Sequence, residues 1–344
     1  MKSIRTTIIT ILLFSMAAVF FFSGCSKSSK VSPERLKEVV VYTYDSFISE
    51  WGPGPALIEA FEKQSGYTLT FISVGDGGQV LSHAVLEKDN PQADVLVGLD
   101  NQLVEEARKR GILTAYKPLN ADLLIPEHLR LADDWLLTPY DWSNFALIYD
   151  TQSSVREPLS LEDLTKEEYA KKIILMDPRT STPGLGFVSW TVSVFGDNYL
   201  DYWKRLKPNI LTMAPGWDTG YGLFTSGEAP LVISYTTSPA YHVEYEDTRR
   251  YKALIFDEGH AYQIEGAGVV NNALNEKGAK AFMDFLISKE AQDLIPLLQW
   301  MYPVNSEVVL PPSFDAAPKA GKNLSADPQK VLDASQKIMN MLSQ

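Results

Sequence analysis

The sequence is poor in the residues that build disulfides, metal sites and catalytic centres. Cys25 is the only cysteine among 344 residues, so no disulfide can form within the chain and its core must hold the fold. A nucleophile turn (GxSxG), a dinucleotide-binding glycine pattern and a paired metal motif (HExxH) are also lacking. The histidines are scattered, at His83, His128, His242 and His260. We therefore expect structural histidines and a protein that is not an enzyme and carries no metal or cofactor.

Positive charge is also scarce. Lys and Arg number 31 against 43 Asp and Glu, which gives a formal net charge of −12. Such a surface repels nucleic acid, so nucleic acid is excluded as a partner, whereas a small cationic ligand is compatible with it. Hydrophobic residues make up 45% and charged residues 22%, a composition typical of folded soluble proteins, and the length suits two compact domains.

The N-terminus carries the first specific signal. Lys2 and Arg5 precede an apolar run over residues 8–22, which is short for a membrane-spanning helix of about 20 residues. Basic residues, an apolar run of this length and small residues at its end predict a secretory signal peptide over residues 1–24.

Cys25 directly follows this segment, as the lipidated cysteine does in a bacterial lipobox. Phe22 departs from the usual aliphatic residue, so a plain signal peptide with an incidental thiol remains the alternative. Residues 25–36 are polar and predict a flexible tether. We expect an extracytoplasmic protein, in the periplasm or on the cell surface, held to a membrane by a lipid on Cys25.

Strand and helix patterns alternate along the rest of the chain. This order predicts an α/β protein with mainly parallel sheets flanked by helices. Strands are expected at 38–43, 68–74, 94–99, 138–149, 173–176, 231–235, 251–256 and 262–270. Helices are expected at 56–65, 79–88, 103–109, 183–195, 199–206, 218–226, 239–247, 277–287, 290–298 and from 328 to about 341.

Ligands of open α/β sheets bind at the carboxyl ends of strands. After the strand at 173–176, Ser181 and Thr182 precede a proline that opens a helix. After the strand at 231–235, Thr236, Thr237 and Ser238 precede Pro239 in the same way. These are ordinary helix caps, or they are two helix N-termini that bind a hydroxyl or phosphate group, and the pattern alone leaves both open.

Glycines and aromatics supply two further features. Gly75-Asp76-Gly77-Gly78 follows a strand; it lacks the Lys-Ser/Thr of a phosphate loop, so a tight turn is the alternative to a ligand loop. Aromatic rings near strand ends can stack on a flat ligand or face a cation, although single aromatics are usually core. The candidates are Tyr42, Tyr44, Trp51, Trp217, Tyr235, Tyr241, Trp300 and Tyr302.

Several segments together resemble the periplasmic thiamine-binding proteins of bacterial ABC importers, within the two-domain solute-binding proteins. They are VYTYDSF at 41–47, WGPGP at 51–55, ADV at 93–95, GLDN at 98–101, DPRTSTPGLG at 177–186, YGLF at 221–224, SYTTSPAYH at 234–242 and WMYPV at 300–304. They lie in order over most of the chain, and the longer runs are far more specific than any short motif. Two departures are the lipobox and Gly78.

The resemblance implies a type II-like periplasmic-binding-protein fold that closes over a ligand between two domains. The first domain would comprise 37–140 and 259–344, with the C-terminal helices, and the second 141–258. It implies a monomer that delivers thiamine or a thiamine phosphate to an importer permease. By the same matching, the site would be lined by Asp76, Gly77, Ser181, Thr182, Trp217, Tyr235, Thr236, Thr237, Ser238 and Pro239, with Tyr44, Tyr241 and Trp300 as further candidates.

Two alternative functions are compatible with the fold class, a binding protein for ferric iron and an enzyme. Related binding proteins for ferric iron use paired, usually adjacent tyrosines, whereas Tyr235 and Tyr241 lie six residues apart. An enzyme that processes thiamine-like pyrimidines would need a nucleophile within the fold, and no cysteine follows Cys25.

Overall fold

The computed structural model describes residues 32–344. The predicted signal peptide, Cys25 and the first part of the tether lie outside the described residues. Arg35–Lys37 forms a 3-10 helix (η1), so the tether predicted over 25–36 overlaps the folded unit at its C-terminal end. In the segment from residue 32 onward, no helix combines the length and apolar character that a membrane crossing requires.

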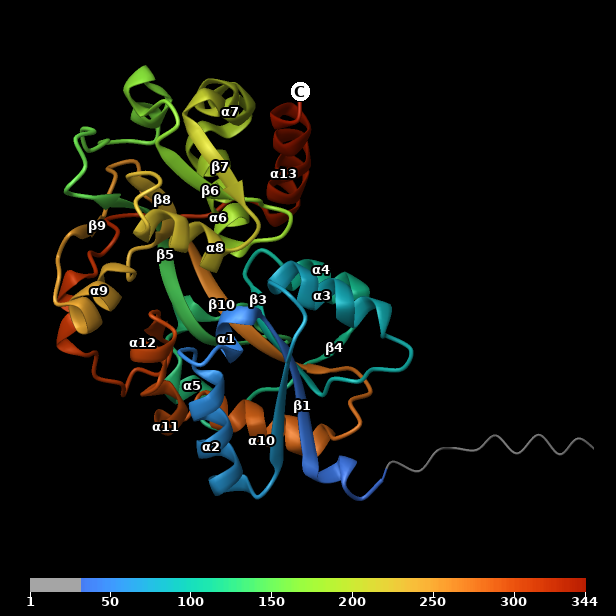
Figure 1. Ribbon diagram of the computed structural model, residues 1–344. Coiled ribbons are helices and arrows are strands. Elements are labelled where there is room, and N and C mark those ends of the chain that lie inside the picture. Colours follow the sequence, from blue (N-terminus) through green and yellow to red (C-terminus); the bar gives the residue numbers. More distant parts are fainter. Residues whose placement is uncertain (1–31) are drawn as a thin grey trace, which may run out of the picture. The chain divides into compact units, whose positions relative to one another are not determined.

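A mixed sheet with the order β2-β1-β3-β10-β5-β8-β6-β7 runs through this unit (Figure 1). The main strands are β1 Glu38–Thr43, β2 Thr68–Ser73, β3 Val95–Asp100, β5 Thr138–Asp150, β6 Ile173–Met176, β7 Ile210–Ala214, β8 Leu231–Tyr235 and β10 His260–Val270. The short ones are β4 Leu113–Thr114, β9 Tyr251–Ala253, β11 Tyr302–Pro303 and β12 Asn323–Leu324.

The sheet has two parallel parts joined by antiparallel strands. β1 is parallel to β2 and β3, and β6 is parallel to β7 and β8. We call these parts the first lobe and the second lobe. The long strands β5 and β10 pair antiparallel with each other and connect the lobes, β10 to β3 and β5 to β8. This arrangement confirms the predicted α/β fold, but the sheet is mixed: parallel pairing is confined to the two lobes, and the strands that connect them pair antiparallel.

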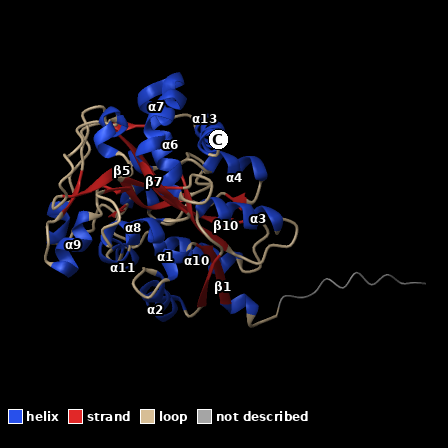
Figure 2. Ribbon diagram, turned by 45° about the horizontal axis from the view of Figure 1, so that its top comes forward, coloured by secondary structure: helices blue, strands red, loops and turns tan. Residues whose placement is uncertain are grey.

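Helices lie on both sides of the strands (Figure 2). They are α1 Asp45–Ile48, α2 Gly54–Ser65, α3 Gly77–Leu86, α4 Val104–Arg110, α5 Ala121–Leu124, α6 Thr182–Phe195, α7 Tyr199–Leu206, α8 Trp217–Thr225, α9 Pro239–Glu246, α10 Glu276–Leu286, α11 Lys289–Gln292, α12 Ile295–Leu298 and α13 Pro328–Leu342. The single helix expected at 290–298 is wrong. Two short helices take its place, and Pro296 in the first turn of α12 has no N–H to continue a helix from α11.

Each lobe has its own apolar core. The second-lobe core contains the fully buried Trp190 and Trp203, and the first-lobe core contains Phe47, Phe61 and Phe282. Helix α13 packs on α6 and α7, and its apolar side chains belong to the second-lobe core (Figure 1). The packing of this helix thus differs from the predicted assignment of 259–344 to the first domain, and the domain boundaries themselves stay a prediction.

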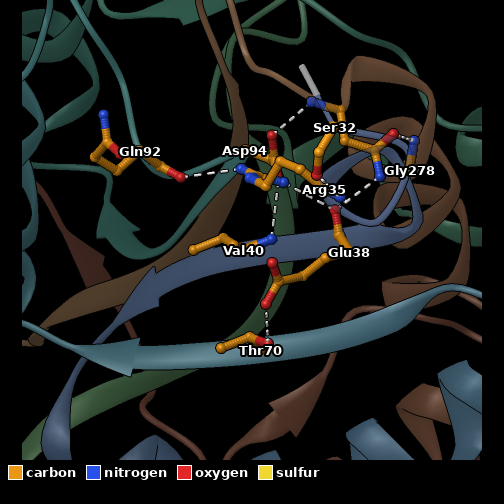
Figure 3. Close-up of polar contacts among 9 residues, drawn as sticks. Ser32, Arg35, Glu38, Val40, Thr70, Gln92, Asp94 and Gly278 are labelled. Atoms are coloured by element: carbon orange, nitrogen blue, oxygen red, sulfur yellow. Dashed lines mark hydrogen bonds and ion pairs between the residues drawn. The ribbon is translucent and has the colours of Figure 1, made fainter. Parts of the chain in front are cut away.

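An ion pair between the half-buried Arg35 and the buried Asp94 stabilises the start of the first lobe (Figure 3). The Arg35 guanidinium donates to Asp94 Oδ2 at 2.8 Å and to the Glu38 carbonyl at 2.9 Å. Asp94 is fully buried and also accepts the backbone N–H groups of Val40, at 2.9 Å, and Asn275, at 2.8 Å. One carboxylate therefore joins the segments that lead into β1, β3 and α10.

Candidate functional site

Asp76 connects the two lobes. It is the N-cap of α3 and accepts the N–H of Gly77 at 2.7 Å. Its two carboxylate oxygens also accept the backbone N–H of Thr182, at 2.9 Å, and the Thr182 hydroxyl, at 2.8 Å. Burial raises the pKa of Asp76, and the hydrogen bonds from Thr182 and Gly77 oppose that shift. Two predicted site residues from different lobes thus meet in one contact.

The glycines before and within α3 have different roles. Gly75 has φ +110°, a conformation that side chains rarely adopt. A Cβ on Gly77 would lie 2.4 Å from the carbonyl oxygen of Gly98, so only glycine allows the turn to approach β3 this closely. A Cβ on Gly78 would meet nothing within 4 Å. The departure from the family pattern at Gly78 therefore does not change the shape of the turn.

The predicted caps lie at the expected places, but their hydroxyls do not cap. Ser181 is the N-cap of α6 and Ser238 that of α9, and neither side chain bonds to its own helix. Ser181 is buried, and its hydroxyl has no hydrogen-bond partner. Ser238 instead lies 2.8 Å from the Ser234 hydroxyl. A free hydroxyl at the N-terminus of α6 can serve an oxygen-rich ligand group.

Thr236 and Thr237 are buried, and their hydroxyls are engaged inside the protein. They lie 3.3 Å and 3.2 Å from the hydroxyl of Ser143, which is on β5. The Thr236 N–H also donates to the Asn144 carbonyl at 2.9 Å. The structure thus shows both threonines fastening the turn after β8 to β5.

Two tryptophans from different lobes lie near each other. Trp51, on the segment between α1 and α2, has its ring centroid 6.2 Å from that of Trp217 at the start of α8. Trp217 is half-buried, stacks on Tyr221 at 4.9 Å, and donates from Nε1 to the Ser234 hydroxyl at 2.8 Å. Because Ser234 also contacts Ser238, the indole ring is held in place beside the turn after β8.

Tyr235 and Tyr44 are joined through polar side chains of β10. The Tyr235 hydroxyl donates to Gln263 Oε1 at 2.7 Å, and Gln263 donates to Glu265. Glu265 accepts the Tyr44 hydroxyl at 2.7 Å and also that of Tyr140. The structure therefore brings Tyr44, from the first lobe, and Tyr235, from the second, to the strand that connects the lobes.

The remaining candidates form a separate group. Tyr241 on α9 meets Trp300 edge to face at 5.2 Å, and Tyr245 lies 5.5 Å from the same ring. Trp300 has φ +59°, unusual for a bulky residue. Pro239 is buried and lines a surface hollow with Tyr251. Among residues 32–344, no hydrogen bond or ring contact joins these three residues directly to Asp76, Trp217 or Tyr235, so their part in a site stays a prediction.

Three buried carboxyl groups were missed by the sequence reasoning. They are Asp100 at the end of β3, Asp141 on β5 and Glu265 on β10. Burial raises the pKa of Asp100 and of Glu265 to about 7, and burial and the charge of Glu265 raise the pKa of Asp141. An acid within or at the end of a predicted strand was the signal that could have found them.

Within residues 32–344, no group of three or more His, Cys, Asp or Glu side chains is placed to hold a metal ion. Tyr235 and Tyr241, the tyrosines considered for iron, make contacts with different partners, Gln263 and Trp300.

Comparison with known proteins assigns the chain to a protein family. The profile of a family described as bacterial extracellular solute-binding protein matches residues 56–322. The chain belongs to this family. Its members are solute-binding proteins rather than enzymes, which confirms the expectation that this protein is not an enzyme.

Thiamine-binding periplasmic proteins are among the relatives of this solute-binding protein. The protein of Brucella abortus is 40% identical over 325 residues and that of Escherichia coli 38% over 296, covering 94% and 85% of this chain and 94% and 88% of theirs. A solved periplasmic thiamin binding protein superposes with a TM-score of 0.82 at 37% identity, covering 89% of this chain and 95% of that one.

More distant structures share the fold. A periplasmic binding protein of Actinobacillus pleuropneumoniae with fructose-6-phosphate bound has a TM-score of 0.75 at 22% identity, covering 88% of this chain and 97% of that one. At that identity the likeness concerns the fold alone. Together with the solved thiamin-binding structure it confirms the two-domain periplasmic-binding-protein fold.

Proposed function

We propose that this solute-binding protein captures thiamine, or a phosphorylated form of it, between its lobes and delivers it to the permease of an ABC importer. The observation that carries the proposal is the 40% identity to a thiamine-binding periplasmic protein along 94% of both chains. The chain works outside the cytoplasm, as its family does. Lobe closure of this hinge type is common among periplasmic binding proteins.

The chemistry of the site supports this ligand. Thiamine has a cationic thiazolium ring, a flat aminopyrimidine and a hydroxyethyl arm that can carry phosphate. Trp217 and Tyr235 offer aromatic faces for the rings. The unpartnered Ser181 hydroxyl at the start of α6 suits the arm or its phosphate. We propose that Asp76, Gly77 and Thr182 border the same ligand site between the lobes, called the cleft below.

Some of the other predicted site residues contact the site through neighbouring side chains, and the rest are supported only by the family resemblance. Tyr44 joins the cleft through Glu265, and Ser238 joins it through Ser234. Thr236 and Thr237 would act by holding the turn after β8, since their hydroxyls already have internal partners. Tyr241, Trp300 and Pro239 remain proposals from the family resemblance.

A lipid on Cys25 and a monomeric state are further proposals. The lipid would hold the protein at a membrane while the polar tether lets it reach the permease. Intact-mass measurement of the protein purified from membranes tests the lipid: we expect an N-terminus at Cys25 carrying acyl chains. A soluble protein with an unmodified thiol would leave the plain signal peptide as the correct alternative.

Calorimetric titration of the purified protein with thiamine tests the function. We expect saturable binding with one site per chain at micromolar or lower ligand, and no turnover of the ligand. Thiamine monophosphate and diphosphate, titrated in parallel, show which form binds best. Absence of heat at micromolar concentrations of all three compounds would contradict the proposal.

Asp76→Ala is expected to weaken thiamine binding about tenfold. The change removes the acceptor of both Thr182 contacts, and a hydrogen bond to a charged group contributes about 1.5–3 kcal/mol, so the closed form loses stability. Dissociation constants from calorimetry measure the effect. Asp89→Ala, an exposed acid near the end of α3, is the control and should bind as the wild type does. Equal affinity of both variants would show that the contact does not stabilise the bound form.

A further inference from the structure

Asp141 and Glu265 face each other across the strands that connect the lobes. They are direct partners in the antiparallel pairing of β5 and β10. The exposed fraction is 0% for Asp141 and 6% for Glu265. Neither oxygen of Asp141 has a hydrogen-bond partner, although both are buried. A buried carboxyl group without a partner is costly and is rare in folded proteins.

The groups around this pair are carboxyl groups, phenols and the amide of Gln263. Tyr44, Tyr140 and Gln263 donate hydrogen bonds to Glu265, which leaves Asp141 without a donor. The pKa of Tyr235 is raised by burial and then by the charges of Glu265, Asp76, Asp141 and Asp100, so all four carboxyl groups act on one phenol. None of the ion pairs found in residues 32–344 includes any of the four.

Asp94 shows how the same fold treats a buried acid that has a structural role. It is as fully buried as Asp141, but it pairs with Arg35 at 2.8 Å and accepts two backbone N–H groups. Asp141 has neither a cation nor a donor. Glu265 has hydrogen-bond donors but Asp141 has none, and no cation pairs with either carboxyl group, so a positive group would stabilise both.

We propose that Asp141 and Glu265 are the counter-ion for the positive charge of the bound ligand, and that the empty pair holds a proton which passes to solvent when the cation arrives. This inference rests on the proposed function, because it assigns the thiazolium cation to these two carboxylates. The phenol rings of Tyr44, Tyr140 and Tyr235 favour a flat organic cation, whose charge is delocalised, over a small hydrated ion.

The groups on the neighbouring strands and helices explain why the two carboxyl groups hold a proton when no ligand is bound. Asp76 precedes α3, Asp100 ends β3, and Tyr44, Tyr140 and Tyr235 approach from the end of β1, from β5 and from β8. None of these groups is a cation, so the hydrogen bonds that Glu265 accepts are not joined by a positive charge that would stabilise two ionised carboxylates at once. A ligand cation that replaces the proton binds more tightly as the pH rises, so affinity should increase between pH 5 and 8.

The test compares Asp141→Asn and Glu265→Gln with Asp89→Asn, an exposed control with the same charge change. We expect each cleft variant to weaken thiamine binding about tenfold or more and the control to leave it unchanged. Titrations in buffers of different ionisation enthalpy should show about one proton released per thiamine near neutral pH in the wild type, and none in Asp141→Asn.

Thermal unfolding separates this role from a structural one. Asp141→Asn removes a buried charge without a cation or donor, so its Tm without ligand at pH 8 should rise by about 2–4 °C. Reduced affinity with unchanged or lower Tm and unchanged proton release would mean that Asp141 only shapes the fold, which overturns the inference. If the variants bind thiamine as the wild type does, the inference alone fails. If the wild type does not bind thiamine, the proposed function fails and the inference fails with it.

Discussion

Replacing Trp217 by alanine is expected to weaken thiamine binding about 30-fold or more, the largest loss of affinity from any single change in the cleft. Trp217 is half-buried, stacks on Tyr221 at 4.9 Å and lies 6.2 Å from Trp51 of the first lobe. An aromatic anchor at the centre of a binding site contributes about 2 kcal/mol or more, and 1.4 kcal/mol corresponds to a factor of ten. Calorimetric dissociation constants measure the loss.

Trp217→Phe is the matched variant for that experiment. It keeps an aromatic face but loses the Nε1 bond to Ser234, 2.8 Å long in the wild type. We expect an affinity between those of the wild type and the alanine variant. If phenylalanine and alanine weaken binding equally, the contribution of Trp217 comes from its hydrogen bond. If neither variant weakens binding, the ligand does not stack on this ring.

Asp94→Ala is expected to lower the free energy of unfolding by about 3–5 kcal/mol. The change leaves the half-buried Arg35 guanidinium without its carboxylate and the buried N–H groups of Val40 and Asn275 without an acceptor (Figure 3). Denaturant unfolding followed by circular dichroism measures the loss. Three segments of the first lobe depend on this one side chain, so the effect should exceed that of any exposed ion pair.

Asp293→Ala provides the comparison for Asp94. Its carboxylate pairs with Lys289 one turn earlier, and both side chains are about half exposed. Exposed pairs contribute about 1 kcal/mol or less, so this variant should unfold almost as the wild type does. A loss of similar size in both variants would contradict the role given to the Arg35–Asp94 pair.

The strands with clear patterns were predictable because burial on both faces leaves an uninterrupted apolar run. β1, β6 and β8 have the predicted bounds, as does helix α7. β7, Ile210–Ala214, was missed. Its sequence is short and follows a 3-10 helix directly, and only its first and last residues, Ile210 and Ala214, are buried, while Leu211 is exposed. Such a strand is recognised by its pairing with β6 rather than by its composition.

The lobe against which α13 packs could not be predicted from its position in the sequence. Its amphipathic pattern predicted the helix itself, and the structure has it at Pro328–Leu342. Nothing in the pattern shows which apolar surface will cover the buried face. The face carries Val331, Ala334 and Ile338 and packs against the second lobe.

The candidate site was predictable where it lies on turns after strands. Asp76, Ser181, Trp217 and Tyr235 all occupy such turns or strand ends, so the general rule for α/β sheets points to them. The partners could not be predicted, because Asp76 and Thr182 are 106 residues apart and Tyr140 and Glu265 are 125 apart. Asp141 and Glu265 lie in the connecting strands, where a charged residue carries no turn or cap signal.

A crystal structure of the protein grown with thiamine monophosphate tests the central claim most directly. We predict ligand density between the lobes, with a ring stacked on Trp217, the phosphate near the Ser181 hydroxyl at the start of α6, and the thiazolium beside Asp141 and Glu265. Density for the ligand at another place, or a cleft that stays empty at saturating ligand, would contradict the proposal that this solute-binding protein captures thiamine between its lobes.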